Sequence, residues 1–67
     1  MKNNIQELRK QQKMTQEELA DLCGVTRQTI ISLESGKYNP SILLAHKIAQ
    51  VFESTIESVF IFDEELS

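Results

Sequence analysis

Residues 24–40, GVTRQTIISLESGKYNP, carry polar side chains at positions where a core needs none. At about 100° per residue, a helix here turns Ile30 and Leu33 to one side. The opposite side carries Gln28, Ile31, Ser32 and Ser35, with Arg27 and Gln28 in the first turn. Arginine pairs with guanine, glutamine with adenine, and an exposed isoleucine contacts a thymine methyl. The outward side therefore fits duplex bases, but it equally fits an ordinary surface helix or a protein partner.

A very short link positions this helix. Thr15 and Glu18 form a capping-box pattern that predicts the start of a preceding helix, and the apolar stripe of that helix ends at Cys23. Only Gly24 and Val25 then precede Thr26, the predicted cap of the next helix. Two helices joined in this way must cross steeply, with Val25 packed between them. This is the geometry of a helix-turn-helix.

Hydroxyl caps and helical spacing account for the remaining elements, so we expect an all-α fold of five helices. They should cover about residues 4–12, 15–24, 26–36, 41–52 and 55–60. The predicted core residues are Ile5, Leu8, Leu19, Ala20, Cys23, Ile30, Leu33, Leu44, Ala45, Ile48, Ala49, Phe52, Ile56, Val59 and Phe60. A chain of 67 residues has room for one domain, spanning 1–67.

The net charge of −3 conceals an asymmetry. Up to Lys37 the chain has six basic and five acidic residues. After Lys37 it has one basic residue, Lys47, and five acidic residues. One end of the molecule can therefore meet phosphates although the average charge is negative. No apolar run approaches the roughly 20 residues of a membrane span, and no signal-peptide pattern is present. We expect a cytoplasmic protein.

The sequence offers little for catalysis or metal binding. Cys23 and His46 are each the only residue of their type, and no metal-ligand spacing or nucleophile with a base is evident. Cys23 suits a small buried side chain, and the alternative is a reactive or intermolecular thiol. We expect no enzyme activity, no metal and no cofactor.

The run from Leu8 to Phe60 resembles the lambda-repressor-like, Cro/CI-type family of DNA-binding domains, also called the XRE family. The matching features are TQEELA, GVTRQTI, the LESGK ending and a proline-led fourth helix. The whole chain is also similar to compact stand-alone bacterial and phage regulators of this family, with GKYNPS, a LAxKIA helix and an IExxF segment. The resemblance implies a homodimeric transcriptional repressor that binds operator DNA.

The resemblance also implies roles for individual residues. Gln16 matches a glutamine that contacts a phosphate and braces the recognition helix. Base-reading or nearby positions are Thr26, Arg27, Gln28, Thr29 and Ile31, although Thr26 also caps and Arg27 can reach a phosphate instead. Lys37, Tyr38 and Asn39 match the loop that grips the backbone on the other side of the groove. Arg9 and Glu34 match a structural salt bridge.

We place a homodimer interface at the end of the chain, in Ile56, Val59, Phe60, Ile61 and Phe62. Phe60-Ile61-Phe62 is a β-prone run, and about residues 60–67 form a candidate short strand that pairs with its two-fold mate. The alternative is that Phe60 packs on the fourth helix of the same chain. A second function also stays open, an antitoxin or adaptor-type module that engages a protein and binds DNA only secondarily.

Overall fold

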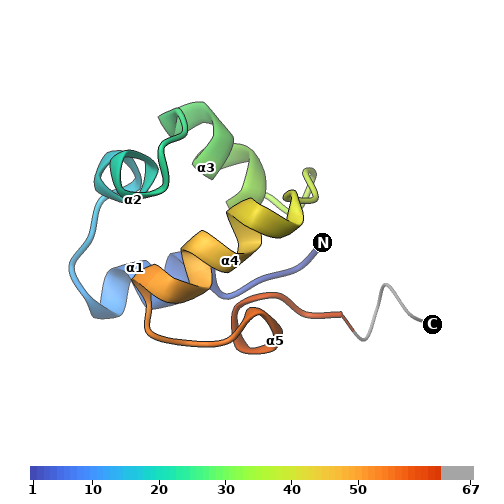
Figure 1. Cartoon of the computed structure of the whole chain (residues 1–67). Helices are drawn as coiled ribbons and strands as arrows, with labels where there is room; N and C mark the ends of the chain where they lie inside the picture. Colours follow the sequence, from blue (N-terminus) through green and yellow to red (C-terminus); the bar gives the residue numbers. More distant parts are fainter. Residues whose placement is uncertain (63–67) are drawn as a thin grey trace.

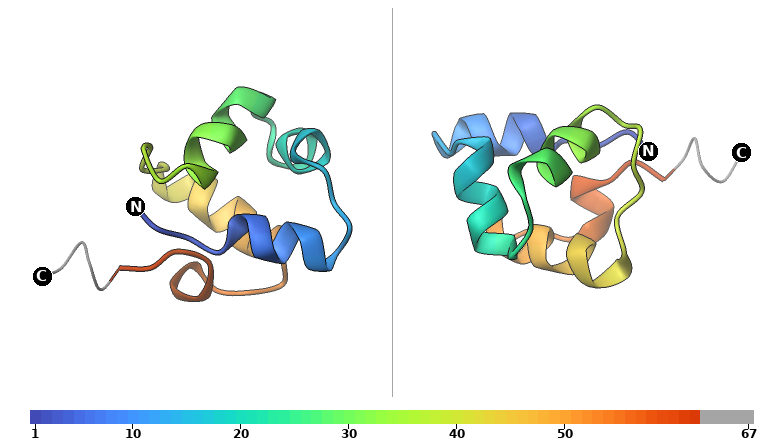
Figure 2. Two further views of the ribbon diagram at one scale, coloured as in Figure 1. Left: turned by 180° about the vertical axis from the view of Figure 1, so that it is seen from behind. Right: turned by 90° about the horizontal axis from the view of Figure 1, so that it is seen from above.

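Five helices make up residues 1–62, the part of the chain that this computed structural model describes (Figure 1). They are α1 (Ile5–Gln11), α2 (Gln16–Cys23), α3 (Arg27–Glu34), α4 (Ile42–Val51) and α5 (Ile56–Val59). The left view of Figure 2 shows α2 and α3 together at the top of the molecule, with α1 and α4 beneath them. The predicted all-α, five-helix fold is confirmed.

Hydroxyl groups start four of the helices. Thr15, Thr26, Ser41 and Thr55 each accept a hydrogen bond from the backbone N–H three residues later. At Thr15 the capping box is complete, because the Glu18 carboxylate accepts from the Thr15 N–H at 3.0 Å, and this bond lowers the pKa of Glu18. Such caps each contribute about 1 kcal/mol. These contacts span three residues, which is why the sequence revealed them.

The turn between α2 and α3 depends on a left-handed residue. Gly24 has φ of +70° and ends α2, and the Val25 N–H donates to the Ala20 carbonyl oxygen at 3.0 Å. A Cβ at Gly24 would meet no atom within 4 Å, so the backbone angle selects glycine and not a lack of space. Val25 is half-buried against the core, between the two helices, as predicted.

All five helices contribute to one apolar core. Its buried members are Ile5, Leu19, Ala20, Cys23, Ile30, Leu33, Leu44, Ala45, Ile48, Ala49, Phe52, Val59 and Phe60. The helical stripes therefore predicted the core correctly, with Leu8 and Ile56 only half-buried at its edge. Burial of this kind, at about 25 cal/mol per Å² of apolar surface, is the main stabilising contribution in a domain of this size.

The two ends of the described chain lie side by side, and this changes the predicted dimer surface. The Asn4 N–H donates to the Val59 carbonyl oxygen at 2.8 Å, and the Ile61 N–H donates to that of Lys2 at 2.9 Å. Asn3 and Phe60 form an isolated antiparallel bridge. Among residues 1–62, this bridge replaces the predicted strand, and it lies within one protomer. Residues 63–67 of that predicted strand lie outside the described residues.

Val59 and Phe60 do not belong to a dimer surface. Their exposed fractions are 0% and 1%, because Phe60 leaves the helix in an extended conformation and turns its ring into the core. We correct the prediction accordingly. Ile56, Ile61 and Phe62 are half-buried and keep some exposed surface.

Asn3 ties this region to α3, and the sequence analysis missed it. Its side-chain amide nitrogen donates to the Leu33 carbonyl oxygen at 2.7 Å, near the end of α3. Its amide oxygen accepts from the Ile5 N–H at 3.2 Å, at the start of α1. One side chain thus satisfies backbone groups of two helix ends. The bonds join residues 30 positions apart, so no local pattern reveals them.

Candidate nucleic-acid interface

The first turn of α3 presents its polar side chains to solvent. Arg27 and Gln28 are exposed, and Thr26 before them caps the helix through its hydroxyl. The Thr29 hydroxyl is half-buried and lies 3.2 Å from that of Thr26, so part of its hydrogen-bonding capacity is used within the turn. Arg27 and Gln28 therefore have the greatest freedom to reach an outside partner.

Ile31 lies on the same face but is not fully exposed. The sequence analysis treated it as an outward apolar side chain, whereas the structure leaves it half-buried. It is also absent from the residues packed against the core. Ile31 therefore retains only part of its surface for a thymine methyl group, and the helical spacing overstated its exposure.

A cleft with two exposed cationic side chains, Lys13 and Arg27, adjoins the start of α2, and a third cation of its lining, Arg9, is paired with Glu34. It has a volume of about 540 Å³ and is lined by Arg9, Lys13, Met14, Thr15, Gln16, Glu17 and Arg27. Lys13 has a left-handed backbone, with φ of +53°, in the link before the capping box. Backbone N–H groups at a helix start and nearby cations together favour an anion such as a phosphate. Lys13 was not among the predicted contacts, although its place beside the helix cap was a usable signal.

An ion pair braces α3 from behind. The Arg9 Nε atom lies 2.8 Å from Glu34 Oε2, and the exposed fractions of the two side chains are 11% and 7%. Arg9 Nη1 also donates to the Met14 carbonyl oxygen at 2.8 Å, and Gln16 Nε2 donates to Glu34 Oε1 at 3.2 Å. The hydrogen bonds that Arg9 donates to the Glu34 carboxylate raise the pKa of Arg9. The network joins α1, α2 and α3, so Gln16 has a bracing contact as well as a position on the cleft.

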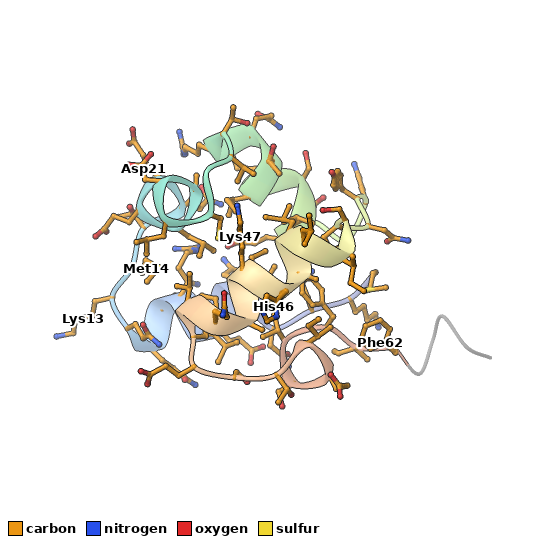
Figure 3. All side chains as sticks on the ribbon, in the orientation of Figure 1. Lys13, Met14, Asp21, His46, Lys47 and Phe62 are labelled. Carbon is orange, nitrogen blue, oxygen red and sulfur yellow. The ribbon has the colours of Figure 1, made fainter. Side chains whose placement is uncertain are left out.

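A second cleft lies on the opposite side of α3, toward α4. It has a volume of about 290 Å³ and is lined by Cys23, Gly24, Val25, Thr29, Tyr38, Ser41, Leu43, Leu44 and Lys47. Figure 3 shows Lys47 extending from α4 toward the space between α2 and α3. The sequence analysis did not select Lys47, because only the packing of α4 under the turn brings it near α3. The first half of α3 is thus flanked by cations on both sides.

The loop after α3 is exposed at its tip. Gly36 has φ of +80°, and its carbonyl oxygen accepts from the Met1 backbone nitrogen at 2.7 Å. Lys37, Tyr38 and Asn39 follow it and are all exposed. The three residues predicted to contact the DNA backbone therefore lie on a loop that Met1 tethers, beside the second cleft.

The helix pair, its left-handed turn and the exposed α3 face agree with a family match that covers residues 5–59. The matching model is HTH_3, described as helix-turn-helix. The chain belongs to the HTH_3 family. Its fold is lambda-repressor-like and of the XRE type, as the sequence resemblance implied. This HTH_3 chain is a DNA-binding transcription regulator, a class that is not enzymatic.

Relatives of this HTH_3 chain occur in archaea and bacteria. An HTH-type transcriptional regulator of Archaeoglobus fulgidus is 60% identical over 65 residues, which is 97% of this chain and 92% of the relative. The HTH-type transcriptional regulator YgzD of Bacillus subtilis is 48% identical over 65 residues, which is 97% of this chain and 98% of the relative. These regulators thus match nearly end to end.

Two solved structures share the fold. The SinR protein/SinI protein complex contains a chain with a TM-score of 0.79 and 26% identity, and the match covers 96% of this chain and 63% of that one. An HTH_3 family transcriptional regulator from Vibrio cholerae has a TM-score of 0.73 and 28% identity. That match covers 94% of this chain and 35% of the solved chain. This HTH_3 chain therefore spans less than two thirds of both solved chains.

Other kinds of site find little support in residues 1–62. Within that range no group of three or more His, Cys, Asp or Glu side chains could hold a metal ion, and no helix could cross a membrane. Cys23 is a free thiol inside the core of the HTH_3 domain, with an exposed fraction of 1%. Burial raises its pKa, despite the partly opposing charge of Lys47. His46 is exposed on α4.

Cys23 should resist thiol reagents in the folded protein. We expect a disulfide reagent to modify native Cys23 about 100-fold or more slowly than Cys23 in denaturant, because reaction requires opening of the core. The raised pKa favours the folded state below the usual thiol pKa, and this contribution is lost as pH rises through the folded value. Equal rates of modification in native and denatured protein would contradict this and favour an oxidant-sensing thiol.

Proposed function

We propose that the protein is a homodimeric repressor whose α3 enters the major groove of a palindromic operator. In this proposal residues 1–67 act as one domain in the cytoplasm. The observation that carries it is the exposed first turn of α3, with Arg27 and Gln28, lying between two clefts that contain cations. A recognition helix needs this arrangement, because side chains that read bases must be flanked by groups that bind the two phosphate backbones.

Roles follow from position and chemistry. Gln28 reads a base, most simply adenine, and Arg27 pairs with guanine or reaches a phosphate. Gln16 and Lys13 bind the backbone at the first cleft. The loop residues Lys37, Tyr38 and Asn39 bind the other strand, and we add Lys47 to that side. Thr26, Thr29 and Ile31 shape the reading surface.

Repression needs no catalysis in this proposal. A dimer that covers two half-sites about 34 Å apart, one helical turn of DNA, prevents polymerase from binding the same segment. The excess acidic charge lies after Lys37 in the sequence, so the net charge of −3 does not conflict with a DNA ligand at the residues before it.

The direct test is fluorescence anisotropy of labelled duplexes from upstream of the protein's own gene, in rising salt. Lys13, Lys37 and Lys47, the three lysines proposed to bind phosphate, supply three cations per protomer. Six phosphate contacts per dimer predict a slope of log affinity against log salt of about −5. Selective binding with a steep slope is expected. If the folded protein binds no duplex even at low salt, the proposal fails.

The antitoxin or adaptor alternative has one favouring observation. Leu22, Ile42 and Leu43 are exposed by 61%, 79% and 72%, and exposed apolar side chains of this size suit a protein contact. The neighbouring SinR structure is itself a complex with another protein. A small protein that copurifies in stoichiometric amount and displaces DNA would favour this alternative.

A further inference from the structure

The exit of α3 is held by residues 1–3, which the DNA-binding proposal does not use. Asn3 Nδ2 donates to the Leu33 carbonyl oxygen, in the last turn of α3, at 2.7 Å. The Met1 backbone nitrogen donates to the carbonyl oxygen of Gly36, also at 2.7 Å, where the chain turns into the loop after α3. Both views of Figure 2 place the N-terminus next to this loop. Two short hydrogen bonds therefore meet the point where the loop begins.

We infer that Asn3 is a positioning residue for the phosphate contact that this loop makes. Lys37 in the loop is proposed above to bind a phosphate, so the role of Asn3 rests on the proposed DNA-binding function. Lys37 is exposed, and its N–H donates to the Ser35 hydroxyl at 3.4 Å. That distance is beyond the usual range of about 2.7–3.2 Å, so this bond fixes the loop only weakly. The two bonds of 2.7 Å at the base of the loop therefore decide where Lys37 lies.

The chemistry of an asparagine suits this position. Its amide nitrogen carries two hydrogens, which reach the carbonyl oxygens of Leu33 at 2.7 Å and Met1 at 3.3 Å. Its amide oxygen accepts from the Ile5 N–H at 3.2 Å. The Leu33 oxygen also accepts from the Gly36 N–H at 3.1 Å, so Asn3 bonds to the carbonyl group that closes the turn after α3. Asn3 thus acts on Leu33 directly and on Gly36 through Met1.

The backbone from which Asn3 acts is itself fixed to the core. Asn3 forms the antiparallel bridge with Phe60, whose side chain is buried with an exposed fraction of 1%. Backbone hydrogen bonds on either side of the bridge join residues 2 and 4 to residues 61 and 59. A close-packed core resists displacement of a buried ring, so this backbone cannot shift freely. Asn3 is therefore a rigid strut between the core and the exit of α3.

The test is fluorescence anisotropy of the preferred duplex in rising salt, for the native full chain and Asn3→Ser. A serine hydroxyl can still accept from the Ile5 N–H, two residues on, but it does not extend to the Leu33 carbonyl oxygen. The variant should bind the duplex about tenfold more weakly, because a charge-assisted contact is lost. Its slope of log affinity against log salt should fall by about 1 per protomer. The preference among duplexes should not change, because Gln28 lies at the other end of α3.

The salt slope separates positioning from a purely structural role. If Asn3 only stabilised the fold, the variant would lower the folded fraction by a similar factor at each salt concentration, and the slope would stay at its native value. Urea denaturation followed by circular dichroism measures that fraction. The Lys37→Ala background gives a second reading. There Asn3→Ser should change affinity by less than about twofold, because the contact that Asn3 positions is already absent.

Asn4→Ser is the matched control. Asn4 is the next residue and is half-buried like Asn3, but its amide nitrogen donates to the Ser58 carbonyl oxygen on α5, at 3.1 Å. It should leave the salt slope unchanged. A native slope in Asn3→Ser, an equal loss in Asn4→Ser, or a tenfold loss that persists in the Lys37→Ala background would each overturn the inference. In those cases the native protein still binds the duplex, whereas failure of the DNA-binding proposal would abolish binding by the native protein itself.

Discussion

Replacing Arg9 by methionine should lower the free energy of unfolding by about 3–5 kcal/mol. The substitution leaves the Glu34 carboxylate, with an exposed side-chain fraction of only 7%, bonded to the neutral Gln16 amide alone. Glu34→Leu should cost a similar amount, because Arg9 then keeps only the Met14 carbonyl oxygen. For 67 residues the total stability is roughly 3–10 kcal/mol, so either variant should be largely unfolded or close to it.

The double variant Arg9→Met, Glu34→Leu should be more stable than either single variant. Removing both charges leaves no buried charge without a partner, and apolar side chains can fill the same space. Urea denaturation followed by circular dichroism measures all three variants. Lys10→Met is the control, since Lys10 is the next residue on α1 and is exposed. Losses that simply add in the double variant would show that the two side chains act independently.

Gln28→Ala should abolish most of the selectivity for the preferred duplex while leaving stability unchanged. A bidentate contact to one base contributes about 1–3 kcal/mol of discrimination, so the affinity ratio between preferred and unrelated duplexes should fall roughly 5- to 150-fold for each half-site. Gln28 is exposed, so truncation of its side chain removes no buried contact. Anisotropy titrations with both duplexes measure the ratio.

Two comparisons sharpen this expectation. Lys37→Ala should weaken binding to all duplexes alike and reduce the salt slope by about 1 per protomer, because Lys37 is proposed to contact phosphate. Gln6→Ala, an exposed glutamine on α1, should change neither quantity. If Gln28→Ala retains full selectivity while Lys37→Ala loses it, the reader is the loop and not α3.

The fold was largely predictable because its signals are local. Each cap joins residues three apart, the α2–α3 turn needs one glycine with positive φ, and helical spacing separates core from surface within each helix. Helical spacing also predicted that Arg27 and Gln28 lie on the outer side of the first turn of α3, where both are exposed. The family resemblance seen in the sequence rests on the same local signals, and the HTH_3 match over residues 5–59 bears it out.

Packing between distant segments of the chain decided the features that the sequence did not predict. Only the tertiary structure turned Phe60 into the core beside Asn3, left Ile31 half-buried and brought Lys47 from α4 to the side of α3. Ile42 shows the same limit, because its exposure depends on which side of α4 the other helices cover. The sequence by itself determined the helices, their turn and the exposed first turn of α3. The position of Lys47 beside α3 depends on long-range contacts, which no periodicity within one helix encodes.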